Sequence, residues 1–382
     1  MNKIDILFDY AKISNKKIEM RNCAYIYQNR EAVFNGKSIR NIMNFINTIK
    51  ETKRNTVMPI VLLIGNVEIE DKLTYIMLEI LCYYVASVLK RQIYVSINAK
   101  NQISTEGIFS SPLGLLGKIK KDNVHKFIEK FEKEIYMRHY RKVISREMLE
   151  DKSLISKLLT EISSYLNFFD VDKKTSMEIA GVITELVDNV SEHTDGDCLI
   201  DIDVTKEYFN VKKRDGLYYG LNVVVLNFSE CLLGDKIKQK IMNDDILNDR
   251  HKKIKEAYSV HKSFFDGEKY KEEDFFNVCS FQHHITGRCE FNDTGGTGLT
   301  KLISSLEKKS EANQCYMVTG ERVIYFRENY LEYNSENWIG FNDENDFLGH
   351  KPLKNLIDAC HIYIPGTAYN LNFVMKKENI KL

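Results

Sequence analysis

The chain has 382 residues, 43% of them hydrophobic and 28% charged, a composition typical of globular proteins that excludes a disordered chain. Lysine plus arginine and aspartate plus glutamate number 54 each, so no overall charge favours nucleic acid or an anionic membrane as a partner. The first residues carry Asp5, Asp9 and Lys12 instead of the apolar run of a signal peptide, and the eight cysteines include no CxxC pair. We therefore expect a cytoplasmic protein of about two domains without a membrane span, and the many Lys, Asn and Ile residues indicate a bacterial source.

The amino-terminal part predicts a small α/β domain over residues 1–105. An apolar run at 57–64 indicates a buried strand, helical spacing follows over 71–92, and 92–99 has the pattern of a second strand. This order predicts a parallel strand pair with a right-handed crossover. Residues 35–54 add an amphipathic helix. The topology resembles the STAS-type domains that partner anti-sigma kinases, and an ordinary small α/β scaffold is the alternative.

The middle of the chain predicts a linker and then helices. Residues 104–117 collect Ser, Gly and one of only four prolines, so we place a linker and helical connector over 106–150. Amphipathic spacing then predicts three successive helices, over 124–144, 153–169 and 175–193.

Strand patterns return in the carboxy-terminal part, which we place at 151–382. After the third helix we expect an antiparallel strand pair, a charged helical stretch, a hairpin that turns at Gly320 and Glu321, and a closing strand. These elements correspond to residues 198–204 and 216–228, 235–264, 314–320 and 322–328, and 366–375.

Three polar residues form a stripe on the third helix. Glu185, Asn189 and His193 are four residues apart, and four residues advance an α-helix by about 400°, so the side chains share one face. A solvated stripe is the simplest interpretation. The functional interpretation is metal and water chemistry, because an amide oxygen is a neutral ligand for Mg²⁺ and a nearby carboxylate can deprotonate water.

A glycine-rich turn follows about a hundred residues later. Residues 292–303, NDTGGTGLTKLI, place Gly295, Gly296 and Gly298 directly before an apolar helix, and Thr297 adds a hydroxyl. Backbone amides at a helix N-terminus bind phosphate, although such glycines also make ordinary turns. The turn matches neither the Walker A pattern nor a dinucleotide fingerprint.

The order of these features resembles the GHKL superfamily, the ATPase domain shared by gyrase, the ninety-kilodalton heat-shock chaperones, histidine kinases and MutL. Residues 185–193, ELVDNVSEH, are most similar to the asparagine box of the anti-sigma-factor serine kinases, and 295–299, GGTGL, to the second glycine box. The resemblance covers about 150–376 in element order. It implies a two-layer α/β sandwich with a mixed sheet and helices on one face.

The resemblance also implies ATP and Mg²⁺ as cofactors and a role for each matching residue. Asn189 would hold Mg²⁺, and Glu185 would be the general base for water or for a protein hydroxyl. Glu192 falls where gyrase-type members have an acid near the nucleotide, and His193 falls where the anti-sigma kinases have their histidine. The phosphates would be held by the second glycine box, that is Gly295, Gly296, Thr297, Gly298 and Leu299.

A lid over the nucleotide is expected at about 235–291. Within it Arg288 is a candidate phosphate contact, as is Lys301 in the helix after the glycine box, and ordinary surface positions are the alternative for both. The cluster Cys279, His283, His284 and Cys289 has zinc-ligand chemistry, but its spacing matches no common finger.

The first glycine box departs from the family pattern. There a strand ends in a pattern like DxGxGI, whose aspartate accepts a hydrogen bond from the adenine amino group. Here Asn227 stands for the aspartate, and Ser229 and Cys231 stand for the two glycines. An asparagine oxygen can still accept this bond but without the charge, and the amide could be reversed to serve another base.

Three hypotheses on function follow. The first is an Mg²⁺-dependent ATPase that acts as a conformational switch on the amino-terminal domain, on a second copy in a homodimer or on a protein partner, in signalling or defence. The second is a protein serine kinase of the anti-sigma type. The third is a nucleotide sensor or scaffold that binds without hydrolysis, as the altered first box would allow.

Overall fold

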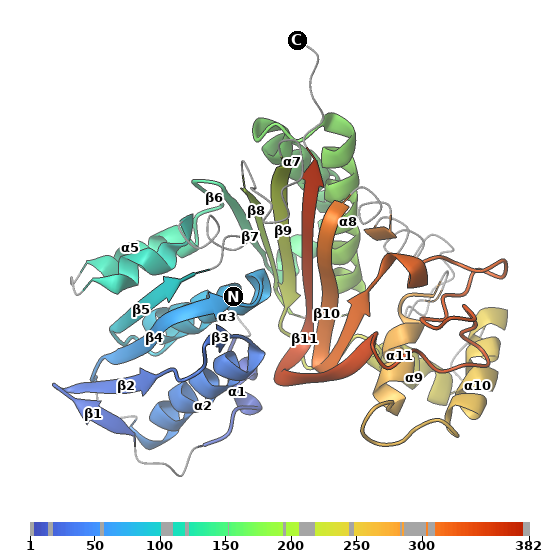
Figure 1. Ribbon diagram of the computed structural model, residues 1–382, viewed down its shortest axis with the longest axis horizontal. Helices are drawn as coiled ribbons and strands as arrows, with labels where there is room; N and C mark the ends of the chain where they lie inside the picture. Colours follow the sequence, from blue (N-terminus) through green and yellow to red (C-terminus); the bar gives the residue numbers. More distant parts are fainter. Residues whose placement is uncertain are drawn as a thin grey trace.

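The computed structural model describes residues 4–13, 18–53, 57–100, 110–118, 122–151, 153–193, 196–205, 218–243, 248–282, 285, 303–304 and 310–376. Within these ranges it contains two sheets, with helices packed against both (Figure 1). No helix of the described part is long and apolar enough to cross a membrane.

The amino-terminal sheet has the expected βαβ unit at its centre. Strand β4 (Ile60–Ile69) pairs in parallel with β5 (Ile93–Ala99), and α3 (Lys72–Tyr83) connects them, followed by a π-helical turn at Tyr84–Val88. Around this unit lie α1 (Ile6–Asp9), β1 (Glu19–Arg21), β2 (Ala24–Gln28), β3 (Val33–Phe34) and the predicted amphipathic helix, α2 (Gly36–Thr52). Because β1 is antiparallel to β2 while β2 and β3 are parallel to β4, this sheet is mixed.

The predicted helix over 124–144 is wrong in its second half. A 3-10 helix (Pro112–Gly117) and α5 (Asn123–Phe131) pack into the amino-terminal core, but the chain then forms β6 (Ile135–Tyr136) and β7 (His139–Ile144). In β7 the side chains alternate. Tyr140 and Ile144 enter the carboxy-terminal core, whereas His139 and Arg141 meet buried acids. Those distant acids are what stabilise a strand here, and local spacing does not reveal them.

The carboxy-terminal sheet has six strands in the order β10-β11-β9-β8-β7-β6. The predicted antiparallel pair is confirmed as β8 (Cys198–Thr205) and β9 (Tyr218–Asn227), and the closing strand as part of β11 (Ile357–Lys376). Every pairing described in this sheet is antiparallel, so the expected mixed carboxy-terminal sheet is wrong.

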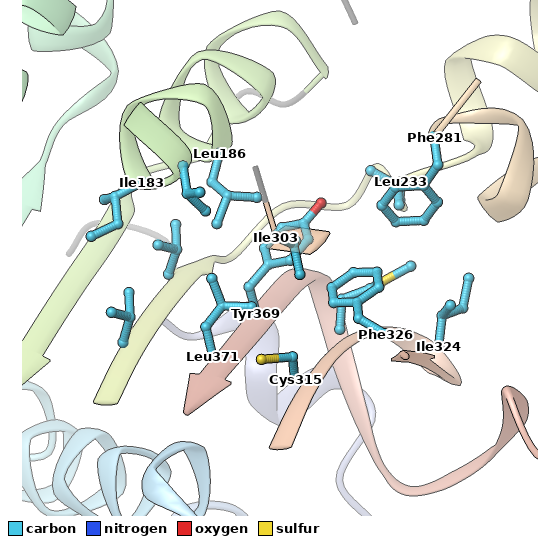
Figure 2. Packing of buried hydrophobic residues seen from close by; sticks show 14 of the residues in the cluster. Ile183, Leu186, Leu233, Phe281, Ile303, Cys315, Ile324, Phe326, Tyr369 and Leu371 are labelled. Carbon is cyan, nitrogen blue, oxygen red and sulfur yellow. The ribbon is translucent and has the colours of Figure 1, made fainter. Parts of the chain in front are cut away.

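Both faces of this sheet are covered. One face packs against the predicted helices α7 (Leu154–Phe168) and α8 (Lys173–His193), reached through the short α6 (Arg146–Leu149); Figure 2 shows Ile183 and Leu186 of α8 packing toward Tyr369 and Leu371 of β11. The other face, with Leu199, packs against the amino-terminal layer (Figure 1). Strands β8 and β9 are therefore buried on both sides, as expected of a sheet between two layers.

The predicted hairpin at Gly320 is wrong, because β10 (Ser310–Phe326) runs through this position as one strand and pairs with β11 on both sides of it. Gly320 has φ +56°, and the register shifts beside it, so the glycine makes a bulge and not a turn. Beyond the bulge, the buried Arg322 forms a paired contact with Asp274, with Nε 2.6 Å from Oδ1 and Nη2 2.8 Å from Oδ2.

The charged stretch after β9 is helical as predicted. It forms α9 (Asp235–Met242) and α10 (Asp249–His261), and α11 (Glu272–Cys279) follows. These helices lie beside the end of β10 (Figure 1). Together with residues 328–356, which begin with a 3-10 turn at Glu328–Tyr330, they enclose an aromatic cluster. Tyr258, Phe275 and Phe347 lie in this cluster around His261.

Candidate functional site

Helix α8 presents the polar pair Glu185 and Asn189 beside its apolar side. Leu186, Val187 and Val190 are buried against the sheet, whereas Glu185 and Asn189 are each half-buried. Burial raises the pKa of the Glu185 carboxyl, and the charge of Asp188 adds to the shift. A carboxyl whose pKa is raised in this way is a better proton acceptor near neutral pH than an ordinary surface glutamate.

A row of small and polar side chains crosses the sheet at one end, on the face that α8 covers. Cys198 of β8 pairs with Asn227 of β9, Asn227 with Thr367 of β11, and Thr367 with Thr319 of β10. Strand alternation places them with Val225, which belongs to the core under α8. The structure thus brings Asn227, the residue predicted to contact the nucleobase, into one row with two threonines that are far away in sequence.

The orientation of the Asn227 amide is determined by its neighbour. The backbone N–H of Thr367 donates to Oδ1 at 2.9 Å, and a reversed amide would place two donors face to face. The Nδ2 group is then left buried without an acceptor among the described residues. Such a group costs about 1–3 kcal/mol unless a partner satisfies it. A ligand with a hydrogen-bond acceptor would supply that partner.

Gly366 leaves the space beside Asn227 free of a side chain. Its φ is +90°, and a Cβ there would lie 2.6 Å from the backbone oxygen of Asn227 and 3.2 Å from its Nδ2. Only glycine accommodates both the backbone angle and the close approach. Glycine at position 366 is therefore required by the geometry around Asn227.

The loop after β9 closes without the glycines of the family pattern. The hydroxyl oxygen of Ser229 accepts from the backbone N–H of Cys231 at 3.0 Å, and the Asp235 carboxylate accepts from that of Leu232 at 2.8 Å. Side-chain acceptors of this kind form turns that need no positive φ. Gly234 packs tightly on α11, since a Cβ there would lie 2.6 Å from the carbonyl carbon of Phe276.

The remaining predicted contacts lie outside what the structure describes. This applies to all of Gly295, Gly296, Thr297, Gly298, Leu299, Arg288 and Lys301, and to the side chains of Glu192 and His193 at the end of α8. Of the zinc candidates, Cys279 is described and buried, and burial raises its thiol pKa well above the usual value. His283, His284 and Cys289 lie outside the described residues.

Sequence reasoning missed a cluster of buried charges between the two layers. Lys72 at the start of α3 places its Nζ 2.5 Å from Asp201 Oδ1 and 2.5 Å from Asp203 Oδ2, both on β8. Arg141 of β7 joins Asp201, at 2.7 Å, to Glu79 of α3. These five charged residues are at most 5% exposed. The alternating aspartates of IDIDV were the signal, because they point out of a strand into the facing layer.

His139, Asp201 and Asp203 have the donor atoms of a metal site, all within 4.8 Å of one another. The ammonium group of Lys72, however, already contacts both carboxylates. Asp203 also accepts from Tyr75 at 3.0 Å and from Asn222 at 2.8 Å. Lysine supplies the positive charge that a metal ion would bring, so we interpret the cluster as a structural joint between the layers.

Comparisons with protein-family models, with curated proteins and with solved structures gave no significant match.

Proposed function

We propose that the chain is an Mg²⁺-dependent nucleotide-binding switch of the GHKL type that binds and hydrolyses ATP. The observation that carries the proposal is the unsatisfied Nδ2 of the buried Asn227, on the face of the sheet that helix α8 covers with its Glu185 and Asn189. Predicted site residues from separate parts of the sequence thus lie on one side of one sheet.

The donor set around Asn227 fits a purine. Nδ2 would donate to a ring nitrogen, and the second lone pair of Oδ1 would accept from the adenine amino group, since Thr367 uses only the first. The same amide could pair with a base that carries an oxygen instead of the amino group. Base preference is therefore part of the test.

Asn189 and Glu185 would act at the phosphate groups of the nucleotide. The amide oxygen of Asn189 would be a ligand of Mg²⁺, whose charge would offset that of the phosphates. Glu185 would orient a water molecule and take its proton, a role that suits the raised pKa of this carboxyl. Movement of α9–α11 relative to the sheet would couple the nucleotide to the rest of the chain.

A nucleotide sensor that does not hydrolyse is the second candidate. It is favoured by the uncharged Asn227 and by Ser229 and Cys231, whose loop closes by side-chain hydrogen bonds instead of glycines. Tight binding without phosphate release would support it. Transfer of the γ-phosphate to a serine of another protein would instead favour the kinase hypothesis.

The test combines binding and turnover. Thermal shifts with ATP, GTP and ADP, with and without Mg²⁺, should show a ligand-dependent rise in melting temperature, because a ligand of the native state stabilises it. Glu185→Ala should lose hydrolysis and retain binding, and Asn189→Ala should lose the Mg²⁺-dependent part of binding. Lys174→Ala, exposed on the same helix, is the matched control. Unchanged thermal stability with all three nucleotides would refute the proposal.

A further inference from the structure

A cavity of about 300 Å³ lies where the amino-terminal layer meets β10 and β11. Its amino-terminal wall comes from the starts of α2 and α3, and its opposite wall from residues 314–325 and 358–364 of the large sheet. This volume is at the lower end of small-molecule sites, and interfaces between domains are a common place for them. It lies on the sheet face opposite α8, away from Glu185 and Asn189.

Two tyrosines form an aromatic corner of this cavity. The rings of Tyr316 and Tyr325 have centroids 6.0 Å apart and planes at 59°. The Tyr316 hydroxyl donates to Asp71 Oδ2 at 2.6 Å, which fixes that ring. Tilted aromatic faces beside carboxylates are the usual surroundings of an organic cation.

Three carboxylates line the same cavity, Glu70 and Asp71 from one wall and Asp358 from the other. No Lys or Arg is among its lining residues, and none of the three acids has an ion-pair partner in the described part of the chain. Partial burial raises the pKa of Glu70, and the charge of the adjacent Asp71 raises it further, as expected of neighbouring acids without a cation between them.

The helix starts at this cavity are closed to anions. Asn35 accepts from the backbone N–H of Lys37 at 3.1 Å, and Asp71 accepts from that of Thr74 at 2.8 Å. One amide at each helix start is thus satisfied by its own cap, and the nearby carboxylates repel negative charge. A cationic ligand would pair with carboxylates that have no Lys or Arg beside them in the cavity lining, whereas a neutral ligand would not.

We propose that this cavity binds a small organic cation, an amine or a guanidinium compound. Its charged groups contact Glu70 and Asp358, and its carbon skeleton packs against Tyr316 and Tyr325. Because Glu70 belongs to the amino-terminal layer and Asp358 to β11, the ligand bridges the two layers and stabilises their contact. The site is independent of the proposed nucleotide site.

Calorimetry and thermal shift on the full chain test this site, with putrescine and agmatine as the cations and butanediol as the neutral analogue. We expect saturable binding of at least one cation with a rise in melting temperature, and no effect of butanediol. Glu70→Gln and Asp358→Asn should each weaken binding by about tenfold, since each removes a charge-assisted contact. Both residues are exposed, so the variants should fold normally.

Two further variants separate the parts of the site. Glu68→Gln removes a neighbouring exposed acid outside the cavity lining and should leave binding unchanged. Tyr325→Phe keeps the ring and should bind like the wild type, whereas Tyr325→Leu should bind about threefold more weakly. No heat and no thermal shift with either cation would overturn the proposal. So would binding of Mg²⁺ or Ca²⁺ alone, or equal losses for Glu68→Gln and Glu70→Gln.

Discussion

The Lys72→Met variant tests whether the buried charges join the two layers. The ammonium group of Lys72 lies 2.5 Å from a carboxylate oxygen of Asp201 and 2.5 Å from one of Asp203, and all three side chains are buried. Methionine keeps most of the apolar stem and removes only the charge. The variant therefore leaves both aspartates without their shared cation.

The size of the loss follows from the partners that remain. Asp201 keeps Arg141, at 2.7 Å, and Asp203 keeps hydrogen bonds from Tyr75 and Asn222. Breaking one buried ion pair costs about 3–5 kcal/mol. Because each aspartate keeps other partners, we count this cost once and not once for each aspartate. We therefore expect Lys72→Met to lower the free energy of unfolding by about 3–5 kcal/mol in total.

Urea unfolding followed by circular dichroism measures this loss, and the slope with denaturant should stay unchanged if the native fold is kept. Lys37→Met is the control, because its pair with Glu31 at 2.8 Å is exposed and contributes at most about 1 kcal/mol. Adding Asp203→Asn should recover part of the loss, since an amide needs no cation. If Lys72→Met costs no more than Lys37→Met, the interpretation of the cluster as a joint is wrong.

Two more predictions concern α10 and the bulge in β10. Burial lowers the pKa of His261 to about 4, so between pH 6.5 and 4 the unfolded state binds more protons than the folded state. We therefore expect the free energy of unfolding to decrease by about 3 kcal/mol as the pH is lowered from 6.5 to 4. The free energy of unfolding measured across this range should depend on pH in the wild type, and this dependence should be absent in His261→Gln. An equal pH dependence in the two proteins would contradict the assignment to His261. Gly320→Ala should lower stability by about 1–3 kcal/mol, because φ is +56° and the new Cβ would lie 2.7 Å from Glu273 Oε1. A melting temperature equal to that of the wild type would contradict this.

Local periodicity was sufficient for much of the fold. The βαβ unit around α3, the amphipathic helices α2, α7 and α8, and the β8–β9 pair were all predicted from spacing and confirmed. Each of these elements has an apolar side that repeats at its own period, and the period is a property of neighbouring residues. The shared helix face of Glu185 and Asn189 was predictable for the same reason.

Elements that depend on distant partners were not predictable in this way. The segment 135–144 has helix-like spacing but forms strands, because His139 and Arg141 contact acids 60–62 positions away in the chain, on β8 and α3. Gly320 was interpreted as a turn because glycine permits both a turn and a bulge, and only pairing with β11 decides between them. The antiparallel order of the sheet likewise depends on which strands meet.

The candidate site also has features that the sequence predicts and features that only the folded structure determines. Sequence alone placed Asn227 at a strand end and Glu185 on a helix. Tertiary structure placed them on one side of one sheet, used the N–H of Thr367 to orient the Asn227 amide, and left its Nδ2 unsatisfied. It also decided that Lys72 lies between Asp201 and Asp203 at the joint between the layers. Hydrogen bonds and charges of this kind act between residues 128–140 positions apart in the chain, so they become visible only when the chain is folded.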